Sequence, residues 1–434
     1  MAHDTSVLLK GKSIYQIFIR NHTAKGTFDA ALPSLPAVKK MGFDIVYLTP
    51  VHPTGKVARK GTLGSPYAIS DYRAVDSPLG GAAGFRRFVD AAHKEGLKLI
   101  MDVVYNHTSP DSVLVKEHPE WFWKGADGKP GPRVADWSDV VDLDYSNKAL
   151  WDYQIETLEK WVRFGVDGFR CDVASLVPVD FWVEARRRIA ALPRPAGSGA
   201  SPCLWLAESV HKEFVAIMRE KGFYAASDAE LHQAFDLTYD YDGRHELDEA
   251  WSGRMPIFAY LHHLDLQACM YPATAIKARF LENHDQPRIA GRMGCGARLR
   301  NWTVFALLLD GTFFAYAGQE RALTKTPSLF DRDPVDWKSG DDTFEAWFGA
   351  AHRATKAVRK REHGFTAREI AAGVVLLERT GGTRPVRALL NLDGRSGTVS
   401  LPAPLEGRDI LTRKQVSLEG TVSLSAEPLV VELE

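Results

Sequence analysis

The chain has 434 residues, which is long enough for one large domain and a second, smaller one. Its formal net charge of -1 excludes a strongly basic protein, so we expect neither a nucleic acid nor an acidic membrane surface as its partner. The four cysteines are scattered without a CxxC pair, which argues against a zinc site and against disulfides.

The N-terminal sequence MAHDTSVLLKGKS contains no long apolar core and no cleavage-site pattern, so we expect no signal peptide and a cytoplasmic protein. The apolar segment VFALLLDGTFFAYAG is interrupted by Asp310 and Gly311 and is too short on either side of them to span a bilayer. Composition leaves the oligomeric state open.

Runs rich in β-branched and aromatic residues alternate with amphipathic stretches. The predicted strands cover residues 13–20, 43–51, 97–107, 166–174, 203–209, 234–242, 275–285 and 312–320. The predicted helices cover residues 33–42, 82–96, 149–165, 179–192, 211–222 and 298–311. Apolar strands joined by helices indicate a parallel sheet covered on both faces, and this series fits a (β/α)8 TIM barrel. A doubly wound open sheet is the alternative, but neither GxGxxG nor a P-loop supports it.

Two departures from this alternation predict further domains. Residues 108–147 are rich in Pro, Asp, Gly and Trp and are too long for a barrel loop, so we predict a short inserted domain B after the third strand. Residues 365–434 read as short strands with Gly and Pro between them, which predicts a C-terminal antiparallel β-sandwich. The barrel would then comprise residues 1–107 and 148–364.

Polar side chains end four of the predicted barrel strands. In chain order they are Asp102, Asn106 and His107, then Arg170 and Asp172, then Glu208, and finally Asn283, His284 and Asp285. Because the C-terminal ends of barrel strands meet at one rim, we expect these side chains to converge. Alternation places Arg170 and Asp172 on the inner face of their strand, where an ion pair is costly unless function requires it. A purely structural ion pair is the alternative.

Two carboxylates beside aromatic-rich insertions favour glycoside hydrolysis. A second insertion, TGKVARKGTLGSPYAISDYRAVD (54–76), follows the second predicted strand. Five aromatic residues of the two insertions are candidates for stacking on sugar rings, with local packing as the alternative: Tyr67, Tyr72, Trp121, Trp123 and Trp137. A catalytic metal is another interpretation of the Asp, His and Glu set, but the chain lacks an HExxH helix and a close His-x-His pair.

Four motifs resemble, in order and spacing, the signature regions of the α-amylase family of glycoside hydrolases, glycoside hydrolase family 13. They are DVVYNH (102–107), GFRCD (168–172), LAES (206–209) and ENHD (282–285). Further motifs of the family are similar to GFDIVYLTPV (42–51), GSPYAISDY (64–72), VDLDYSN (141–147) and GTFFAYAGQE (311–320). The resemblance covers about residues 12–320. The C-terminal domain is similar only in being a β domain.

The resemblance implies a retaining mechanism with a covalent glycosyl-enzyme intermediate. Three carboxylates would be catalytic: Asp172 as nucleophile, Glu208 as general acid and then base, and Asp285 as the group that holds the distorted sugar. Tyr67, His107, Arg170 and His284 would bind substrate, with Asp102 and Asn106 as supporting residues. Retention requires the two reacting carboxyls to lie about 5–5.5 Å apart. A cation beside Asp172 is expected to lower its pKa.

No cofactor is expected for catalysis. Asn106 corresponds to a calcium ligand in some relatives, but the Lys-His pair of calcium-binding members is replaced here by SLVP (175–178), and the insertion is short. These departures argue against a structural Ca²⁺ ion and against binding of long polymers. Four loop carboxylates of the insertion are the remaining candidate ligands, with solvated side chains as the alternative: Asp111, Asp127, Asp136 and Asp139.

The resemblance favours hydrolysis of α-1,4-glucosidic bonds in malto-oligosaccharides or related α-glucans. An α-1,6-glucosidase, a transglycosylase or a disaccharide isomerase acting on trehalose-, sucrose- or maltose-type substrates is the alternative, because the family uses one nucleophile and acid for all of them. A non-catalytic carbohydrate-binding relative is disfavoured, since all three carboxylates are present.

Overall fold

The computed structural model describes residues 2, 4–193, 203–359, 364–380 and 384–434. Eight parallel strands close into a barrel in the order β1-β10-β9-β8-β7-β6-β3-β2. Their bounds are β1 Ser13–Ile17, β2 Ile45–Leu48, β3 Lys98–Val103, β6 Gly168–Cys171, β7 Leu204–Ala207, β8 Leu237–Tyr239, β9 Ile276–Arg279 and β10 Thr312–Tyr316. The predicted (β/α)8 fold class is confirmed.

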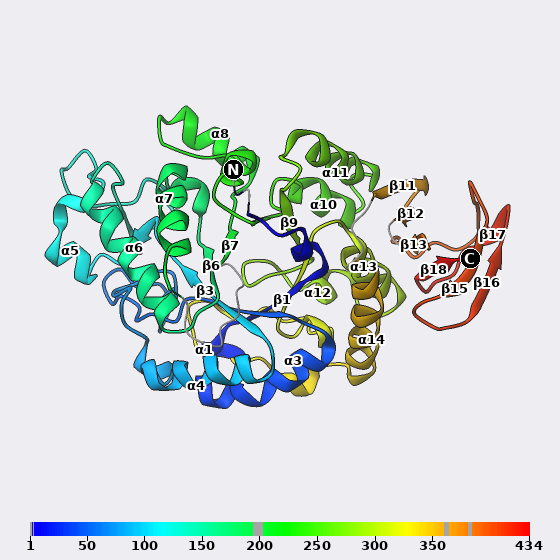
Figure 1. Cartoon of the computed structure of the whole chain (residues 1–434), viewed down its shortest axis with the longest axis horizontal. Coiled ribbons are helices and arrows are strands. Elements are labelled where there is room, and N and C mark those ends of the chain that lie inside the picture. Colours follow the sequence, from blue (N-terminus) through cyan, green and yellow to red (C-terminus); the bar gives the residue numbers. More distant parts are fainter. Residues whose placement is uncertain (1, 3, 194–202, 360–363, 381–383) are drawn as a thin grey trace.

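Helices cover the outside of this barrel (Figure 1). The longer ones are α3 Leu35–Met41, α4 Gly81–Lys94, α6 Lys148–Arg163, α7 Val179–Ala190, α8 Lys212–Glu220, α10 Arg244–Trp251, α11 Phe258–Met270, α13 Ala297–Leu308 and α14 Asp342–Arg359. Shorter ones are α1 Ile19–His22, α2 Phe28–Ala31, α5 Val113–Glu117, α9 Asp228–Leu231 and α12 Ile289–Met293. Among the described residues, no helix combines the length and apolarity that crossing a bilayer requires.

The strand that carries Arg170 alternates as the sequence predicts. Phe169 and Cys171 are fully buried in the large core between barrel and helices, whereas Arg170 is buried inside the barrel rim. Gly168 at the start of the same strand allows close pairing, because a Cβ there would lie 2.3 Å from the carbonyl oxygen of Leu204 on β7. The pairing of β6 with β7 therefore sets the spacing of the polar residues that follow each strand.

Several predicted strands end earlier in the structure than the sequence suggested. The predicted segments 13–20, 97–107, 275–285 and 312–320 leave the barrel ladder after Ile17, Val103, Arg279 and Tyr316 respectively. The residues beyond these points form turns whose backbone groups bond locally; the N–H of Asp285, for example, donates to Asn283 Oδ1 at 2.9 Å. The motif residues at the ends of the predicted strands therefore lie on rim loops.

The inserted segment forms its own small unit on the barrel rim. Strands β4 (His107–Thr108) and β5 (Val141–Asp142) pair antiparallel at its base, with His107 opposite Asp142. Helix α5 belongs to the same unit, which lies at the end of the molecule away from the C-terminal strands (Figure 1). The insertion is thus attached to the barrel at a motif residue of the third strand.

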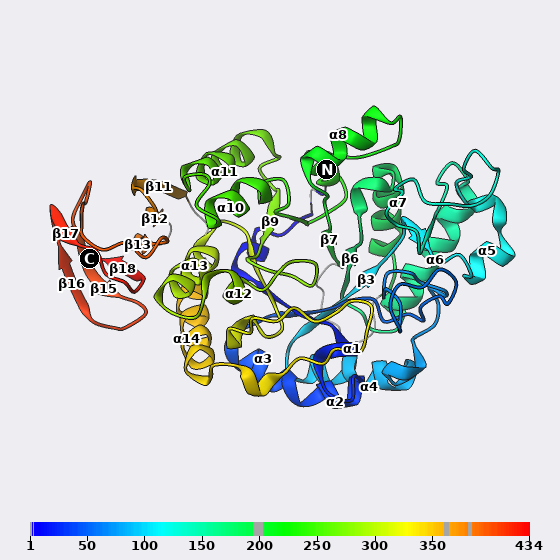
Figure 2. The same cartoon turned by 180° about the vertical axis from the view of Figure 1, so that it is seen from behind.

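The C-terminal strands form an antiparallel sheet in the order β11-β12-β13-β18-β15-β16, backed by the two-stranded pair β14-β17. Their bounds are β11 Phe365–Ala371, β12 Val374–Arg379, β13 Val386–Asn391, β14 Thr398–Ser400, β15 Leu405–Asp409, β16 Gln415–Leu418, β17 Thr421–Ser423 and β18 Leu429–Leu433. This unit lies beyond α13 and α14 at one end of the molecule (Figure 2).

Candidate active site

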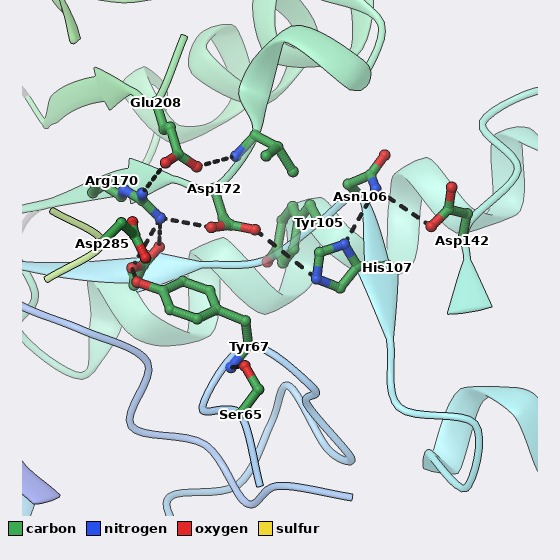
Figure 3. A network of polar contacts seen from close by, with 12 residues as sticks. Ser65, Tyr67, Tyr105, Asn106, His107, Asp142, Arg170, Asp172, Glu208 and Asp285 are labelled. Carbon is green, nitrogen blue, oxygen red and sulfur yellow. Dashed lines mark hydrogen bonds and ion pairs between the residues drawn. The ribbon is translucent and has the colours of Figure 1, made fainter. Parts of the chain in front are cut away.

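The guanidinium of Arg170 is the centre of a polar network on the barrel rim (Figure 3). It is fully buried, and its Nη1 lies 2.8 Å from Asp172 Oδ1 and 2.9 Å from Asp102 Oδ1. Its Nη2 lies 2.8 Å from Glu208 Oε1. One cation thus holds carboxylates from three neighbouring strands, β3, β6 and β7, which is the convergence that the sequence predicts.

The residue after Asp172 adds a backbone contact to Glu208. Val173 adopts a left-handed conformation with φ 36°, which is strained for a β-branched residue. In this conformation its N–H donates to Glu208 Oε2 at 2.8 Å. Both oxygens of Glu208 are therefore fixed, one by Arg170 and one by the strained turn.

His284 and Asp285 line the opposite side of the network together with Tyr67. The rings of Tyr67 and His284 stack with centroids 5.4 Å apart, and the Tyr67 hydroxyl also contacts His284 Nε2. His284 Nε2 lies 3.1 Å from Asp285 Oδ2, while its Nδ1 is 2.6 Å from the side-chain nitrogen of Gln16. The Tyr67 hydroxyl also donates to Asp102 Oδ2 at 3.0 Å.

His107 lies on the side of Asp172 that faces the insertion. Its Nε2 is 4.0 Å from Asp172 Oδ2, and its Nδ1 is 3.2 Å from the amide nitrogen of Asn106. The Trp137 ring packs 5.6 Å from the His107 ring, so the insertion contributes one wall beside the nucleophile candidate. The structure thus brings together all nine site residues that the sequence singled out.

Three carboxylates of the site, Asp102, Asp172 and Asp285, have pKa values above the ordinary value of an aspartate. Burial, then the neighbouring Glu208, raises the pKa of Asp172 well above its usual value, against the opposing charge of Arg170. Burial likewise raises the pKa of Asp285 to about 7 and that of Asp102 to about 6. Arg170 lowers the pKa of Asp172 as expected, but burial and the neighbouring carboxylates outweigh it, so the net pKa of Asp172 in the free protein is raised.

Both histidines are neutral at physiological pH. Burial lowers the pKa of His107 to about 4, and burial together with Arg170 lowers the pKa of His284 well below its usual value. Each ring therefore has one donor and one acceptor nitrogen, suited to fixed hydrogen bonds with sugar hydroxyls.

Two of the aromatic residues predicted to stack on sugars are core residues. Tyr72 is buried with its hydroxyl donating to the His107 carbonyl at 2.6 Å, and Trp121 is buried against His118. Trp123 and Trp137 are only partly buried. The prediction failed for Tyr72 and Trp121 because the insertions are long enough to form their own packed core.

Sequence reasoning missed three residues that support the network. Tyr47 donates to Asp102 Oδ2 at 2.5 Å, Gln16 contacts His284, and Val173 donates its N–H to Glu208. Strand alternation was a usable signal for Tyr47 and Gln16, since both lie on inner barrel positions of β2 and β1. No signal in the sequence marks the left-handed turn at Val173.

Calcium, which the resemblance associates with Asn106, does not fit the side chains present. Because an ionised carboxylate only accepts hydrogen bonds, Asn106 turns its amide nitrogen toward Asp142 Oδ1, 3.5 Å away. The other oxygen of Asp142 already lies 3.5 Å from the Arg133 guanidinium. Of the loop carboxylates, Asp139 pairs with Lys60 at 2.9 Å. Within the described part of the chain, no group of three or more His, Cys, Asp or Glu side chains could hold a metal ion.

A family model described as "Alpha amylase, catalytic domain" matches residues 20–370. Among solved structures, an alpha-amylase from Lactobacillus plantarum aligns with a TM-score of 0.92 and 38% identity, covering 99% of this chain and 100% of that one. A noncanonic maltogenic alpha-amylase from Thermotoga neapolitana aligns with a TM-score of 0.85 and 32% identity, covering 98% and 100%.

Curated relatives match over a shorter range. An alpha-1,4-glucan:maltose-1-phosphate maltosyltransferase from Salinibacter ruber is 36% identical over 205 residues, which is 40% of this chain and 30% of the relative. The enzyme of the same name from Myxococcus xanthus is 35% identical over 202 residues, with the same shares. The alignments thus span less than a third of the length of these relatives. Given the family match over most of its length and its likeness to whole solved alpha-amylases, the chain belongs to the alpha-amylase family.

Proposed function

We propose that the protein is a retaining α-glycosidase that hydrolyses α-1,4-glucosidic bonds of malto-oligosaccharides or related α-glucans. The observation that carries this proposal is the Arg170 guanidinium shared by Asp172 and Glu208, with one nitrogen 2.8 Å from an oxygen of each. Carboxyls held side by side suit double displacement, whereas an inverting pair needs room for a water molecule. Likeness over the whole chain to the Lactobacillus plantarum alpha-amylase supports the α-1,4 linkage.

In the first step, Asp172 attacks the anomeric carbon of the sugar. Its Oδ1 is held by Arg170, so Oδ2, which lies 4.0 Å from His107, is the oxygen that forms the bond. The bond from the anomeric carbon to the glycosidic oxygen breaks, and Glu208 gives its proton to that oxygen. The leaving sugar departs as an alcohol.

In the second step, Glu208 acts as a base. It takes a proton from a water molecule, whose oxygen attacks the anomeric carbon, and the bond to Asp172 breaks. Two displacements restore the starting configuration, so the product is the α anomer. Asp285, Tyr67, His107 and His284 bind the sugar being transferred, with Asp102 and Asn106 supporting them. No step requires a cofactor.

Transfer of the glycosyl unit to a sugar instead of water is the second candidate. It is favoured by the identity of about a third to the maltosyltransferases in the aligned region. The chemistry up to the covalent intermediate is the same, and the acceptor decides the outcome. We expect the loops 52–66, 108–140 and 321–340 to shape the cleft and so to select the acceptor.

Product analysis distinguishes the candidates. The protein is incubated separately with maltoheptaose, pullulan, isomaltose and sucrose, and with maltotriose plus maltose 1-phosphate. We expect shorter α-1,4 oligosaccharides from maltoheptaose, with the α anomer appearing first by proton NMR. Elongated products without net release of reducing ends would instead establish a transferase, and initial β anomers would contradict retention.

The catalytic assignments predict the behaviour of two isosteric variants. Asp172→Asn and Glu208→Gln should each lower kcat on maltoheptaose by about 10³-fold or more, since each removes a group that reacts in the transition state. Asp90→Asn, which changes an exposed carboxylate on α4, serves as the control and should keep full activity. Activity that survives either active-site change would overturn these roles.

A further inference from the structure

Among the contacts between the inserted segment and the barrel is that of one buried carboxylate, Asp142 on β5, with Asn106 of the barrel. Asp142 is 1% exposed and stands opposite His107 in the β4-β5 pair. Its Oδ2 accepts the backbone N–H of Arg133 at 3.0 Å and lies 3.5 Å from the guanidinium of the same residue. A second guanidinium nitrogen of Arg133 donates to the Leu143 carbonyl at 3.2 Å. One side-chain cation thus faces both a buried carboxylate and a carbonyl oxygen.

Arg133 is also held between the insertion and the barrel. Its guanidinium carbon lies 5.8 Å from the centre of the Trp123 ring, which belongs to the insertion, and 6.0 Å from that of Phe223, which follows α8. The two rings contact each other edge to face at 5.9 Å. Since only 18% of its side chain is exposed, Arg133 is a fixed cation and not a mobile surface charge.

A chain of contacts runs from Asp142, the partner of this cation, through Asn106 and His107 to Asp172 (Figure 3). The Asn106 amide nitrogen lies 3.5 Å from Asp142 Oδ1 and 3.2 Å from His107 Nδ1. A nitrogen that receives a hydrogen bond from an amide N–H cannot carry the ring proton, so in the neutral ring the proton is on Nε2. That nitrogen faces Asp172 Oδ2 at 4.0 Å.

We infer that Arg133 takes the structural place of a bound metal ion where the inserted segment meets the barrel. It stabilises the contact between the two and, through Asp142 and Asn106, fixes the His107 tautomer with the proton on Nε2. Arg133, Asp142 and Asn106 are positioning residues. That the Nε2 proton of His107 would face the sugar beside Asp172 rests on the proposed glycosidase function. The attachment of the inserted segment and the tautomer of His107 do not.

The test compares the wild-type protein with Arg133→Ala, Arg133→Lys and a control, Arg187→Ala, which removes an exposed arginine on α7. Thermal unfolding is measured with EDTA and with excess CaCl₂. We expect the wild-type Tm to be the same in both, and Arg133→Ala to lower Tm by at least about 5 °C, since it leaves a buried carboxylate unpaired. CaCl₂ should recover part of that loss, and Arg133→Lys should retain most of the wild-type Tm.

The second readout is the His107 tautomer, observed by NMR of ¹⁵N-histidine-labelled protein and assigned with His107→Gln. We expect wild-type protein to have the proton on Nε2 and Arg133→Ala to show a mixture. A wild-type Tm that falls in EDTA and returns with CaCl₂, an Arg133→Ala protein as stable as the control, or a wild-type proton on Nδ1 would overturn the inference. None of these outcomes depends on glycosidase activity, so failure of the proposed function is detected separately.

Discussion

Arg170 shows how one side chain determines the chemistry of its neighbours. Its two terminal nitrogens bind Asp102, Asp172 and Glu208, yet a single positive charge cannot balance three buried carboxylates and the nearby Asp285. Carboxyls of the free site therefore hold protons that ordinary carboxyls would lose. Their raised pKa values lower the free energy of unfolding at neutral pH, a loss of stability that an active site can carry for function.

This cost predicts a pH-dependent gain from replacing Asp285. Its pKa is raised from 3.8 in the unfolded chain to about 7, so its contribution to stability is complete below about pH 4 and is lost as the pH rises through 7. A third of its side chain is exposed, so solvent screens part of the effect. We expect Asp285→Asn to exceed wild type at pH 8 by about 1 kcal/mol in free energy of unfolding, and to match it at pH 4.

Urea denaturation at the two pH values measures this difference, with Asp90→Asn as the control for loss of an exposed carboxylate. The prediction would be contradicted if Asp285→Asn had a lower free energy of unfolding than wild type at pH 8. It would also be contradicted if the difference from wild type were the same at pH 4 and pH 8.

At the scale of elements, the pair β6-β7 sets the distance between Asp172 and Glu208. Gly168 allows this pairing, because a Cβ would lie 2.3 Å from the Leu204 carbonyl, a backbone atom that cannot yield alone. Gly168→Ala should therefore cost about 3 kcal/mol in stability and about 10–100-fold in kcat/KM, since it moves the two carboxyls apart.

Gly84→Ala on α4 is the matched control, because its nearest neighbour would be at 3.5 Å, an ordinary contact. This change should leave kcat/KM unaltered and stability equal or higher. If Gly168→Ala behaved like the control in both measurements, close pairing of β6 and β7 would not be what positions the site.

The elements also show where sequence patterns are informative. The barrel strands could be predicted because each is an apolar run buried on two faces, and the site residues because they follow those runs in order. Strand ends could not, since rim residues form turns that depend on tertiary contacts, such as the bond that the Asn283 side-chain amide donates to the Tyr241 hydroxyl at 2.7 Å. A buried ion pair also departs from the pattern: Lys277 on β9 and Asp242, which lies beyond the end of β8, are 2.9 Å apart where apolar packing was expected.

At the scale of the whole molecule, the C-terminal sheet packs against α13, a helix that is buried from Asn301 to its end at Leu308. The Trp302 side chain of this helix donates to the Leu392 carbonyl at 3.0 Å. From the sheet, Arg379 donates to the carbonyls of Leu308 and Leu309, each at 2.9 Å. Barrel and sheet should therefore unfold together.

Differential scanning calorimetry tests this coupling. We expect one transition for the full chain, and for Arg379→Ala a lower Tm of that single transition, because two buried carbonyls lose their donor at a cost of about 2–4 kcal/mol. The control is Arg408→Ala, an exposed arginine of the same sheet. Two transitions of which only one responds to Arg379→Ala would mean that the sheet folds independently of the barrel.

The central claim is that Asp172 forms a covalent bond to the sugar, and mass spectrometry of a trapped intermediate tests it most directly. The Glu208→Gln protein is mixed with α-maltosyl fluoride, whose leaving group needs no acid, while loss of the base slows release of the intermediate. We predict a protein heavier by one maltosyl unit, with the added mass on the peptide that contains Asp172. Consumption of the fluoride without any adduct, or an adduct on a different residue, would contradict the account.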